Sequence, residues 1–111
     1  MNAIKDCEIK NWTDPNGNPA GGRVVGTGLD ISWQDGPLGR NTERQEPNGA
    51  FVETVISAAK KRIEFYQTAS NGKFACRENV LAITTLEEAL MWLEKRTKDR
   101  EARLVEGTHA V

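Results

Sequence analysis

Three arginines near the end of the chain have a spacing that could bind phosphate groups. Arg96, Arg100 and Arg103 lie at positions i, i+4 and i+7, so a helix that continues through all three places them on one face. The planar guanidinium group donates paired hydrogen bonds that match the oxygens of a phosphate. Such a face could hold a diphosphate or a cyclic nucleotide.

The same segment also has the composition of a solvated helix end. Glu94 can pair with Lys98 and Asp99 with Arg103, each at a spacing of four residues. Cations near a helix C-terminus are stabilised by the helix dipole. Periodicity alone favours this second interpretation, and the phosphate-binding face stays open as the alternative.

A second group of candidate binding residues surrounds the segment from Phe74 to Asn79. Asn79 projects onto the apolar stripe of the predicted second helix, where a buried amide is costly unless it is hydrogen-bonded. It could bond the edge of a ligand's base or cap the first turn, and capping is favoured on physical grounds alone. Phe65 and Tyr66 end the preceding predicted helix opposite this segment. They could stack a nucleobase, although such aromatics more often belong to a core.

The chain offers little for catalysis or metal binding. Its one histidine, His109, lies close to the C-terminus, and its two cysteines, Cys7 and Cys76, are far apart. These residues cannot supply a closed zinc site, and a nucleophile would lack a positioned base. Gly26-Thr27-Gly28 lacks the pattern of a phosphate-binding glycine loop. We therefore expect no metal, no cofactor and no enzymatic activity.

Composition and charge exclude several classes of protein. The chain has 111 residues, of which 38% are hydrophobic and 28% charged, with a formal net charge of −1. This balance argues against a bulk nucleic-acid binder. No apolar run is long enough to span a membrane, and the N-terminus lacks the apolar region of a secretory signal. We expect a cytoplasmic protein whose cysteines are thiols.

The first part of the chain, residues 1–35, is predicted to form a small antiparallel β-hairpin or sheet. One strand is expected over Cys7–Trp12 and another over Gly22–Trp33, with turn residues at Asp14–Pro19 between them. Gly26 and Gly28 are interpreted as a bulge within the second strand. Residues 36–47 are expected to form a loop, because hydrophobic residues are sparse there.

The second part, residues 48–100, is predicted to form a two-helix hairpin followed by a charged tail over 101–111. The first helix is expected to begin with Asn48 as its N-cap and to end near Thr68, before Ser70-Asn71-Gly72. The second is expected over Arg77–Lys98, with a later start near Thr85 as an alternative. The apolar stripe of the first helix consists of Val52, Val55, Ile56, Ala59, Ile63 and Tyr66. Its opposite face consists of Glu53, Ser57, Lys60, Lys61 and Glu64.

Leu81, Met91 and Trp92 lie off the core stripe of the second helix. A second apolar face on a domain with a small core predicts burial against another subunit. The expected fold class is therefore α+β, in one domain spanning residues 1–111, as an oligomer.

From Asn48 onward the sequence resembles a known family, the phage Thoeris anti-defence proteins of the first type. These share a C-terminal helical hairpin with the second-type anti-CBASS proteins. The resemblance rests on Gly36-Pro37, Asn48-Gly49-Ala50, Phe74-Ala75-Cys76-Arg77-Glu78-Asn79, Leu86-Glu87-Glu88-Ala89-Leu90, Trp92-Leu93, Arg96-Thr97 and Val105-Glu106-Gly107-Thr108-His109. It covers about the last 65 residues well and the β part only loosely. Leu104 departs from the family pattern, which has glycine at this position.

The resemblance implies a protein that sequesters a cyclic nucleotide immune signal without cleaving it. The family's signal is a cyclised ADP-ribose made by bacterial TIR enzymes, and related hairpin proteins bind cyclic di- or trinucleotides. The resemblance further implies a hexamer with ligand pockets between its subunits.

The resemblance also implies roles for single residues. Tyr66 or Phe65 would stack the adenine and Asn79 would read a polar edge of the base. Arg96, with Arg77 or Arg103, would hold phosphates. Arg44 would close the pocket from the loop, and Phe74 joins the ligand-binding set as part of the matching run.

Two other functions compete with this one. The protein could be a structural adaptor that uses the hairpin only to oligomerise, or a small phosphodiesterase. The poor metal chemistry weakens the phosphodiesterase. A melting temperature that rises with an adenine nucleotide would distinguish a binding module from an adaptor.

Overall fold

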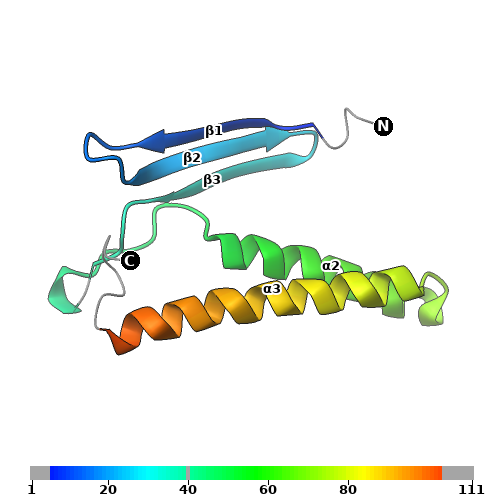
Figure 1. Cartoon of the computed structure of the whole chain (residues 1–111). Coiled ribbons are helices and arrows are strands. Elements are labelled where there is room, and N and C mark those ends of the chain that lie inside the picture. The colour runs from blue at the N-terminus through cyan, green and yellow to red at the C-terminus, as the bar shows by residue number, and fades with distance from the viewer. Residues whose placement is uncertain (1–5, 40, 104–111) are drawn as a thin grey trace. The chain divides into compact units, whose positions relative to one another are not determined.

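The computed structural model describes residues 6–39 and 41–103 of the chain. It contains a sheet of strands β1 (Glu8–Thr13), β2 (Pro19–Gly26) and β3 (Leu29–Asp35), then a short 3-10 helix η1 (Asn41–Glu43), and then helices α2 (Val52–Gly72) and α3 (Arg77–Ala102) (Figure 1). This order confirms the predicted α+β composition, with an antiparallel β part followed by two helices.

The chain divides into two compact units. Of the described residues, 6–39, 41–51 and 100–103 form the sheet unit, and 52–99 form the helical unit. The predicted grouping of residues 1–111 into one domain stays a prediction. Of the expected tail, residues 101 and 102 belong to α3, and the segment from Leu104 to Val111, with His109, lies outside the described residues.

The β part has three antiparallel strands in the order β1-β2-β3 (Figure 1). The prediction of one strand over Gly22–Trp33 was wrong, because Thr27 and Gly28 form a two-residue turn and Gly26 pairs with Leu29. Gly28 has a φ of 73°, a conformation that glycine adopts at low cost and that a tight turn needs. The glycines interpreted as a bulge therefore reverse the chain instead.

The two faces of the sheet differ in character. The cross-strand row of Ile9, Val24 and Ile31 is apolar, and the next row contains Lys10, Arg23 and Ser32. Arg23 donates two hydrogen bonds to Asp30, of 3.0 and 2.8 Å. These bonds lower the pKa of Asp30 and raise the pKa of Arg23. Because the pKa of Asp30 is lowered, the pair stabilises the sheet above the ordinary aspartate pKa, and this contribution is lost as the pH falls through the lowered value.

The predicted N-cap at Asn48 was wrong, because α2 begins later, at Val52. Asn48 instead tethers the chain to the end of β3: its Oδ1 accepts from the Asp35 N–H at 2.8 Å and its Nδ2 donates to the Asp35 carbonyl at 3.1 Å. Ala50 then forms a parallel bridge with Trp33. A Cβ at Gly49 would lie 2.5 Å from the Trp33 carbonyl oxygen, so this close approach requires glycine.

The regular part of α2 ends, and α3 begins, at the residues predicted from the sequence. Regular helical geometry in α2 stops after Thr68, since Ala69, Ser70 and Asn71 have non-helical φ and ψ. α3 begins at Arg77, as predicted, and the alternative start near Thr85 was wrong. α3 continues past Lys98 to Ala102, so Arg96 and Arg100 lie within one helix and Arg103 follows it directly.

α2 and α3 run antiparallel (Figure 1), and each helix carries half-buried apolar side chains. The half-buried apolar side chains are Val55, Ile56 and Ile63 of α2 with Ala82, Ile83, Leu86, Ala89, Leu90 and Leu93 of α3. Val52, Ala59 and Tyr66, assigned to the stripe from periodicity, are exposed. Lys60, assigned to the opposite face, is only 19% exposed in its side chain and pairs with Glu64 at 3.9 Å and with Glu87 at 3.7 Å. Its long aliphatic stem lies along the hairpin while its ammonium group reaches a carboxylate on each helix.

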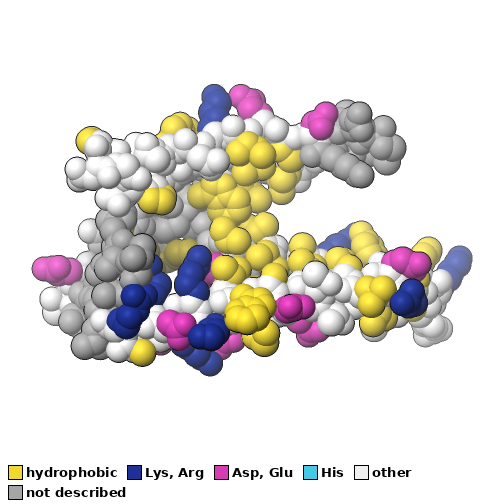
Figure 2. Space-filling view, in the orientation of Figure 1, with side chains coloured by type: hydrophobic (Ala, Val, Ile, Leu, Met, Phe, Trp, Pro, Cys, Tyr) yellow, Lys and Arg dark blue, Asp and Glu magenta, His cyan; other side chains and the backbone are white. Residues whose placement is uncertain are grey.

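Within the described residues, no hydrophobic side chain is fully buried. Leu81, Met91 and Trp92, the residues of the second apolar face, are each about half exposed, and Trp92 is 57% exposed. Hydrophobic side chains reach the molecular surface along both helices and on the sheet (Figure 2). A chain of this size normally buries a core, and neither unit buries one among its described residues. No helix in the described part of the chain combines the length and apolar character needed to cross a membrane.

Candidate functional site

Gln67, near the end of α2, holds the beginning of α3 in place. Its Oε1 accepts from the Cys76 N–H at 3.0 Å, and its Nε2 donates to the Cys76 carbonyl at 3.3 Å. The same Oε1 accepts from Nδ2 of Asn79 at 3.0 Å. One side chain therefore clamps the turn between the two helices and fixes a candidate ligand-binding residue.

Asn79 is half-buried in the first turn of α3, and both of its hydrogen bonds use its Nδ2 group. The second bond runs from Nδ2 to the Phe74 carbonyl at 3.4 Å. An N-cap accepts backbone N–H groups through its side-chain oxygen, so Asn79 does not act as a cap here. The ligand-reading role of Asn79 stays a prediction, and its Oδ1 is the atom that the turn does not use.

The aromatic residues of this region are exposed at the same end of the hairpin as Asn79. Phe65 and Tyr66 lie with ring centroids 6.2 Å apart and planes tilted by 56°. The guanidinium of Arg62 covers both rings, at 5.1 and 5.0 Å from their centroids, and its Nε donates to the Tyr66 hydroxyl at 3.2 Å. Phe74 is more than half exposed and carries the Lys73 ammonium 5.5 Å from its ring centroid. Aromatic surface beside cations suits a nucleobase attached to phosphates.

We call this set the turn cluster: Phe65, Tyr66, Gln67, Phe74, Arg77 and Asn79, with Arg62. The structure thus brings five of the predicted site residues to one end of the hairpin. Sequence analysis missed Arg62 and Gln67. Arg62 had a signal, since it precedes Phe65 and Tyr66 by three and four residues, the helical spacing for contact. Gln67 had none, because its partners lie across the turn.

The remaining predicted residue of the helical unit, Arg96, lies at the other end of the hairpin. Its guanidinium approaches a carboxylate oxygen of Glu53 at 3.7 Å, with the Arg96 side chain 60% and the Glu53 side chain 40% exposed. Of the pairs expected for a solvated helix end, Glu94 with Lys98 is confirmed at 3.2 Å. Asp99 with Arg103 was wrong, because Asp99 accepts from Lys95 at 2.9 Å, one helical turn earlier.

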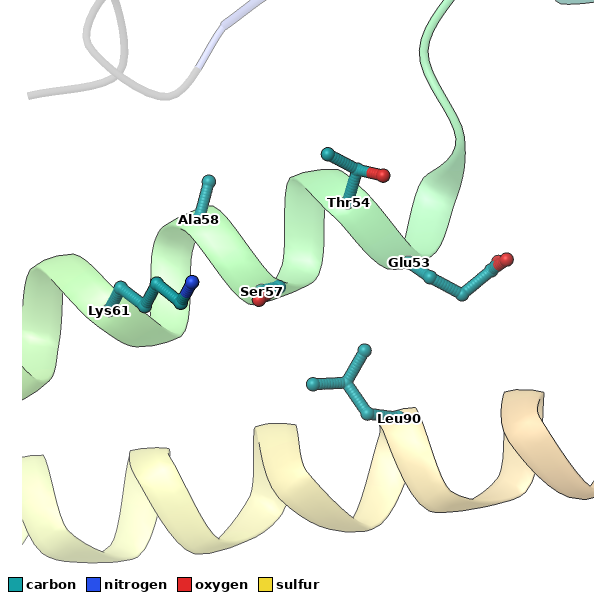
Figure 3. Close-up of a pocket in the computed structure, with 6 residues that line it drawn as sticks. All are labelled: Glu53, Thr54, Ser57, Ala58, Lys61 and Leu90. Carbon is teal, nitrogen blue, oxygen red and sulfur yellow. The ribbon is translucent and has the colours of Figure 1, made fainter. Parts of the chain in front are cut away.

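A groove of about 490 Å³ lies between the two helices next to this ion pair (Figure 3). Its lining consists of Glu53, Thr54, Ser57, Ala58 and Lys61 of α2 with Leu90 of α3. Leu90 points from α3 toward α2 (Figure 3). Sequence analysis assigned Glu53, Ser57 and Lys61 to a solvent face. They instead flank a groove of the size that small ligands occupy.

The helical unit thus carries two separate clusters. At a rise of about 1.5 Å per residue, Asn79 and Arg96 lie about 25 Å apart along α3. Arg44, in the loop after η1, and Arg103 belong to the sheet unit, and their roles stay predictions. Within the described residues, no group of three or more metal-ligating side chains comes together.

Comparison with known proteins gives two matches. The Acb2/Tad1 hairpin domain matches residues 27–98, which include β3 and most of the hairpin. Thoeris anti-defense 1 of Bacillus phage SBSphiJ7 is 49% identical over 79 residues, 71% of this chain and 51% of that protein. The chain therefore spans about half the length of this relative. The matched residues 27–98 contain both clusters of the hairpin, and we conclude that this chain belongs to the Acb2/Tad1 hairpin family.

Proposed function

We propose that this protein binds a cyclised ADP-ribose made by TIR enzymes and withholds it from its effector without cleaving it. The turn cluster is the observation that supports this proposal most strongly. It combines exposed aromatic rings for a purine, a half-buried amide beside them and the cations Arg62 and Arg77. The relative's name, Thoeris anti-defense 1, agrees with a role against a defence system.

The distance between the two clusters suggests how the site is completed. A cyclic nucleotide cannot span the roughly 25 Å between Asn79 and Arg96 of one hairpin. If two hairpins associate antiparallel, the turn cluster of one subunit lies next to Arg96 of the other. We therefore propose a homo-oligomer, a hexamer by resemblance, with ligand pockets between subunits. Cyclic di- or trinucleotides are further candidates for such pockets.

The groove next to Glu53 and Arg96 fits this scheme. Thr54 and Ser57 bring hydroxyl groups to it and Lys61 brings an ammonium group, which suit the sugar hydroxyls and phosphates of the same ligand. The ion pair of Arg96 with Glu53 is exposed and long, so a phosphate can replace the carboxylate at small cost. The protein would act in the cytoplasm of the infected bacterium, where the signal is made, and it needs no nucleic acid or membrane partner.

Calorimetry with the TIR-generated signal tests the proposal. We expect saturable binding and a melting temperature that rises with ligand, since ligand at 100 times Kd adds about 2.7 kcal/mol to the free energy of unfolding. AMP, which has one phosphate and no ring closure, serves as the control and should bind far more weakly. If the signal gives neither heat of binding nor a shift in melting temperature, the proposal is wrong.

A further inference from the structure

The hydrogen bonds of the turn cluster have a fixed direction, which begins at the backbone of Cys76. A backbone N–H can only donate and a carbonyl oxygen can only accept. Gln67 bonds both groups of Cys76, so its Oε1 must face the N–H and its Nε2 must face the carbonyl. In the reverse orientation, Nε2 would face the Cys76 N–H and Oε1 would face the Cys76 carbonyl. Donor would then meet donor and acceptor would meet acceptor. The orientation of the Gln67 amide is therefore set by the backbone.

The orientation of Gln67 in turn sets that of Asn79. The Asn79 amide meets two acceptors, Oε1 of Gln67 at 3.0 Å and the Phe74 carbonyl at 3.4 Å. Only its Nδ2 group can satisfy them, because Oδ1 in the same place would bring three acceptors together. Oδ1 is consequently directed away from this pair, and within the described part of the chain no donor bonds it.

We propose that Gln67 is a positioning residue that makes the turn cluster selective for a purine with a hydrogen-bond donor at position 6. The inference rests on the proposed function and adds a rule of specificity to it. With Oδ1 as the only group that Asn79 has left, the site accepts the 6-amino group of adenine and disfavours a purine with a carbonyl at that position. A carbonyl there would face Oδ1 and leave two acceptors unpaired, a mismatch that binding sites reject strongly.

Two ligands that differ at this one position test the proposal. A TIR enzyme supplied with NAD gives the adenine signal, and the same enzyme supplied with nicotinamide hypoxanthine dinucleotide gives the hypoxanthine counterpart. Calorimetry on the full-length wild-type chain should show that the adenine ligand binds at least about tenfold more tightly. If Asn79 instead offered Nδ2 to the ligand, the preference would be reversed.

Variants of Gln67 separate positioning from simple support of the turn. Gln67→Met keeps the length of the side chain and removes its polar atoms, so only the 3.4 Å bond to the Phe74 carbonyl still orients the Asn79 amide. The preference for adenine should then fall to about threefold or less. Gln67→Glu keeps an acceptor for the Cys76 N–H and for Asn79 and should retain the preference, although it loses the bond to the Cys76 carbonyl and its negative charge lowers the affinity for both ligands. Thr85→Val removes an exposed side-chain hydrogen bond on α3 and serves as the matched control, with the preference unchanged.

The possible outcomes test the proposed function, the specificity rule and the positioning role of Gln67 separately. If the wild-type chain binds neither ligand, the proposed function is wrong and the specificity rule falls with it. If it binds both equally, or prefers hypoxanthine, the function stands and the rule is wrong. A Gln67→Met variant that keeps the full preference would show that Gln67 only supports the turn. If that variant does not fold, the wild-type comparison and Gln67→Glu still decide the rule.

Discussion

Replacing Arg96 with alanine should lower the affinity for the cyclic signal by about tenfold or more without changing the helical content. A hydrogen bond to a charged group contributes about 1.5–3 kcal/mol, and in the proposed pocket Arg96 gives one to a phosphate. Its only ion pair among the described residues, with Glu53 at 3.7 Å, is exposed and adds little to stability. Calorimetry measures the affinity, and circular dichroism measures the helical content.

Two further variants give this prediction its controls. Lys98→Ala removes another exposed cation of α3, paired only with Glu94 in the described structure, and should leave the affinity unchanged. Glu53→Gln removes the carboxylate that competes with the ligand for Arg96 and should bind equally tightly or more tightly. An Arg96→Ala variant with wild-type affinity would assign Arg96 to the solvated face of the helix and contradict its role in the site.

Replacing Trp92 with glutamate should dissociate the proposed oligomer. Trp92 is 57% exposed in the single chain, and Leu81 and Met91 are also exposed on the same helix. Tryptophan side chains at the centre of an interface typically contribute at least about 2 kcal/mol to association, and a charge introduced there must also be desolvated. We expect the dissociation constant of the subunits to rise by about 30-fold or more. Light scattering over a dilution series measures it.

Lys98→Glu is the control for the added negative charge. It introduces the same carboxylate at a polar position of α3 and should leave the proposed oligomer intact. If pockets form between subunits, Trp92→Glu should also lose ligand affinity, whereas an adaptor would lose only its assembly. A wild-type chain that is a stable monomer at micromolar concentration would contradict the proposed assembly.

Local sequence signals predicted the helices better than the strands. The end of regular helix at Thr68 and the start of α3 at Arg77 follow from Gly72 and from apolar periodicity, which are properties of neighbouring residues. Asn48 has the side chain of an N-cap, yet its amide bonds the backbone of Asp35, far away in the sequence. Thr27-Gly28 was not distinguished from a bulge, because only the pairing of Gly26 with Leu29 shows that the chain turns there.

The sequence predicted which residues form much of the candidate site, but not the hydrogen bonds that connect them. Phe65, Tyr66 and Asn79 were expected near one another, and the bonds of Gln67 to Cys76 and Asn79 do join the end of α2 to the start of α3. That network depends on two helices meeting across a turn, which no periodic pattern specifies. Periodicity also cannot show that Lys60 reaches Glu87 on the other helix.

The central claim, sequestration without cleavage, is tested most directly by recovering the bound signal. The protein is incubated with TIR-generated cyclised ADP-ribose, separated from free ligand and denatured by heat, and the released molecule is analysed by mass spectrometry and assayed with the effector enzyme. We predict a released molecule of unchanged mass that activates the effector fully, in an amount that matches the binding sites measured by calorimetry. Recovery of a linear or hydrolysed product would show that the protein is an enzyme and would contradict the account.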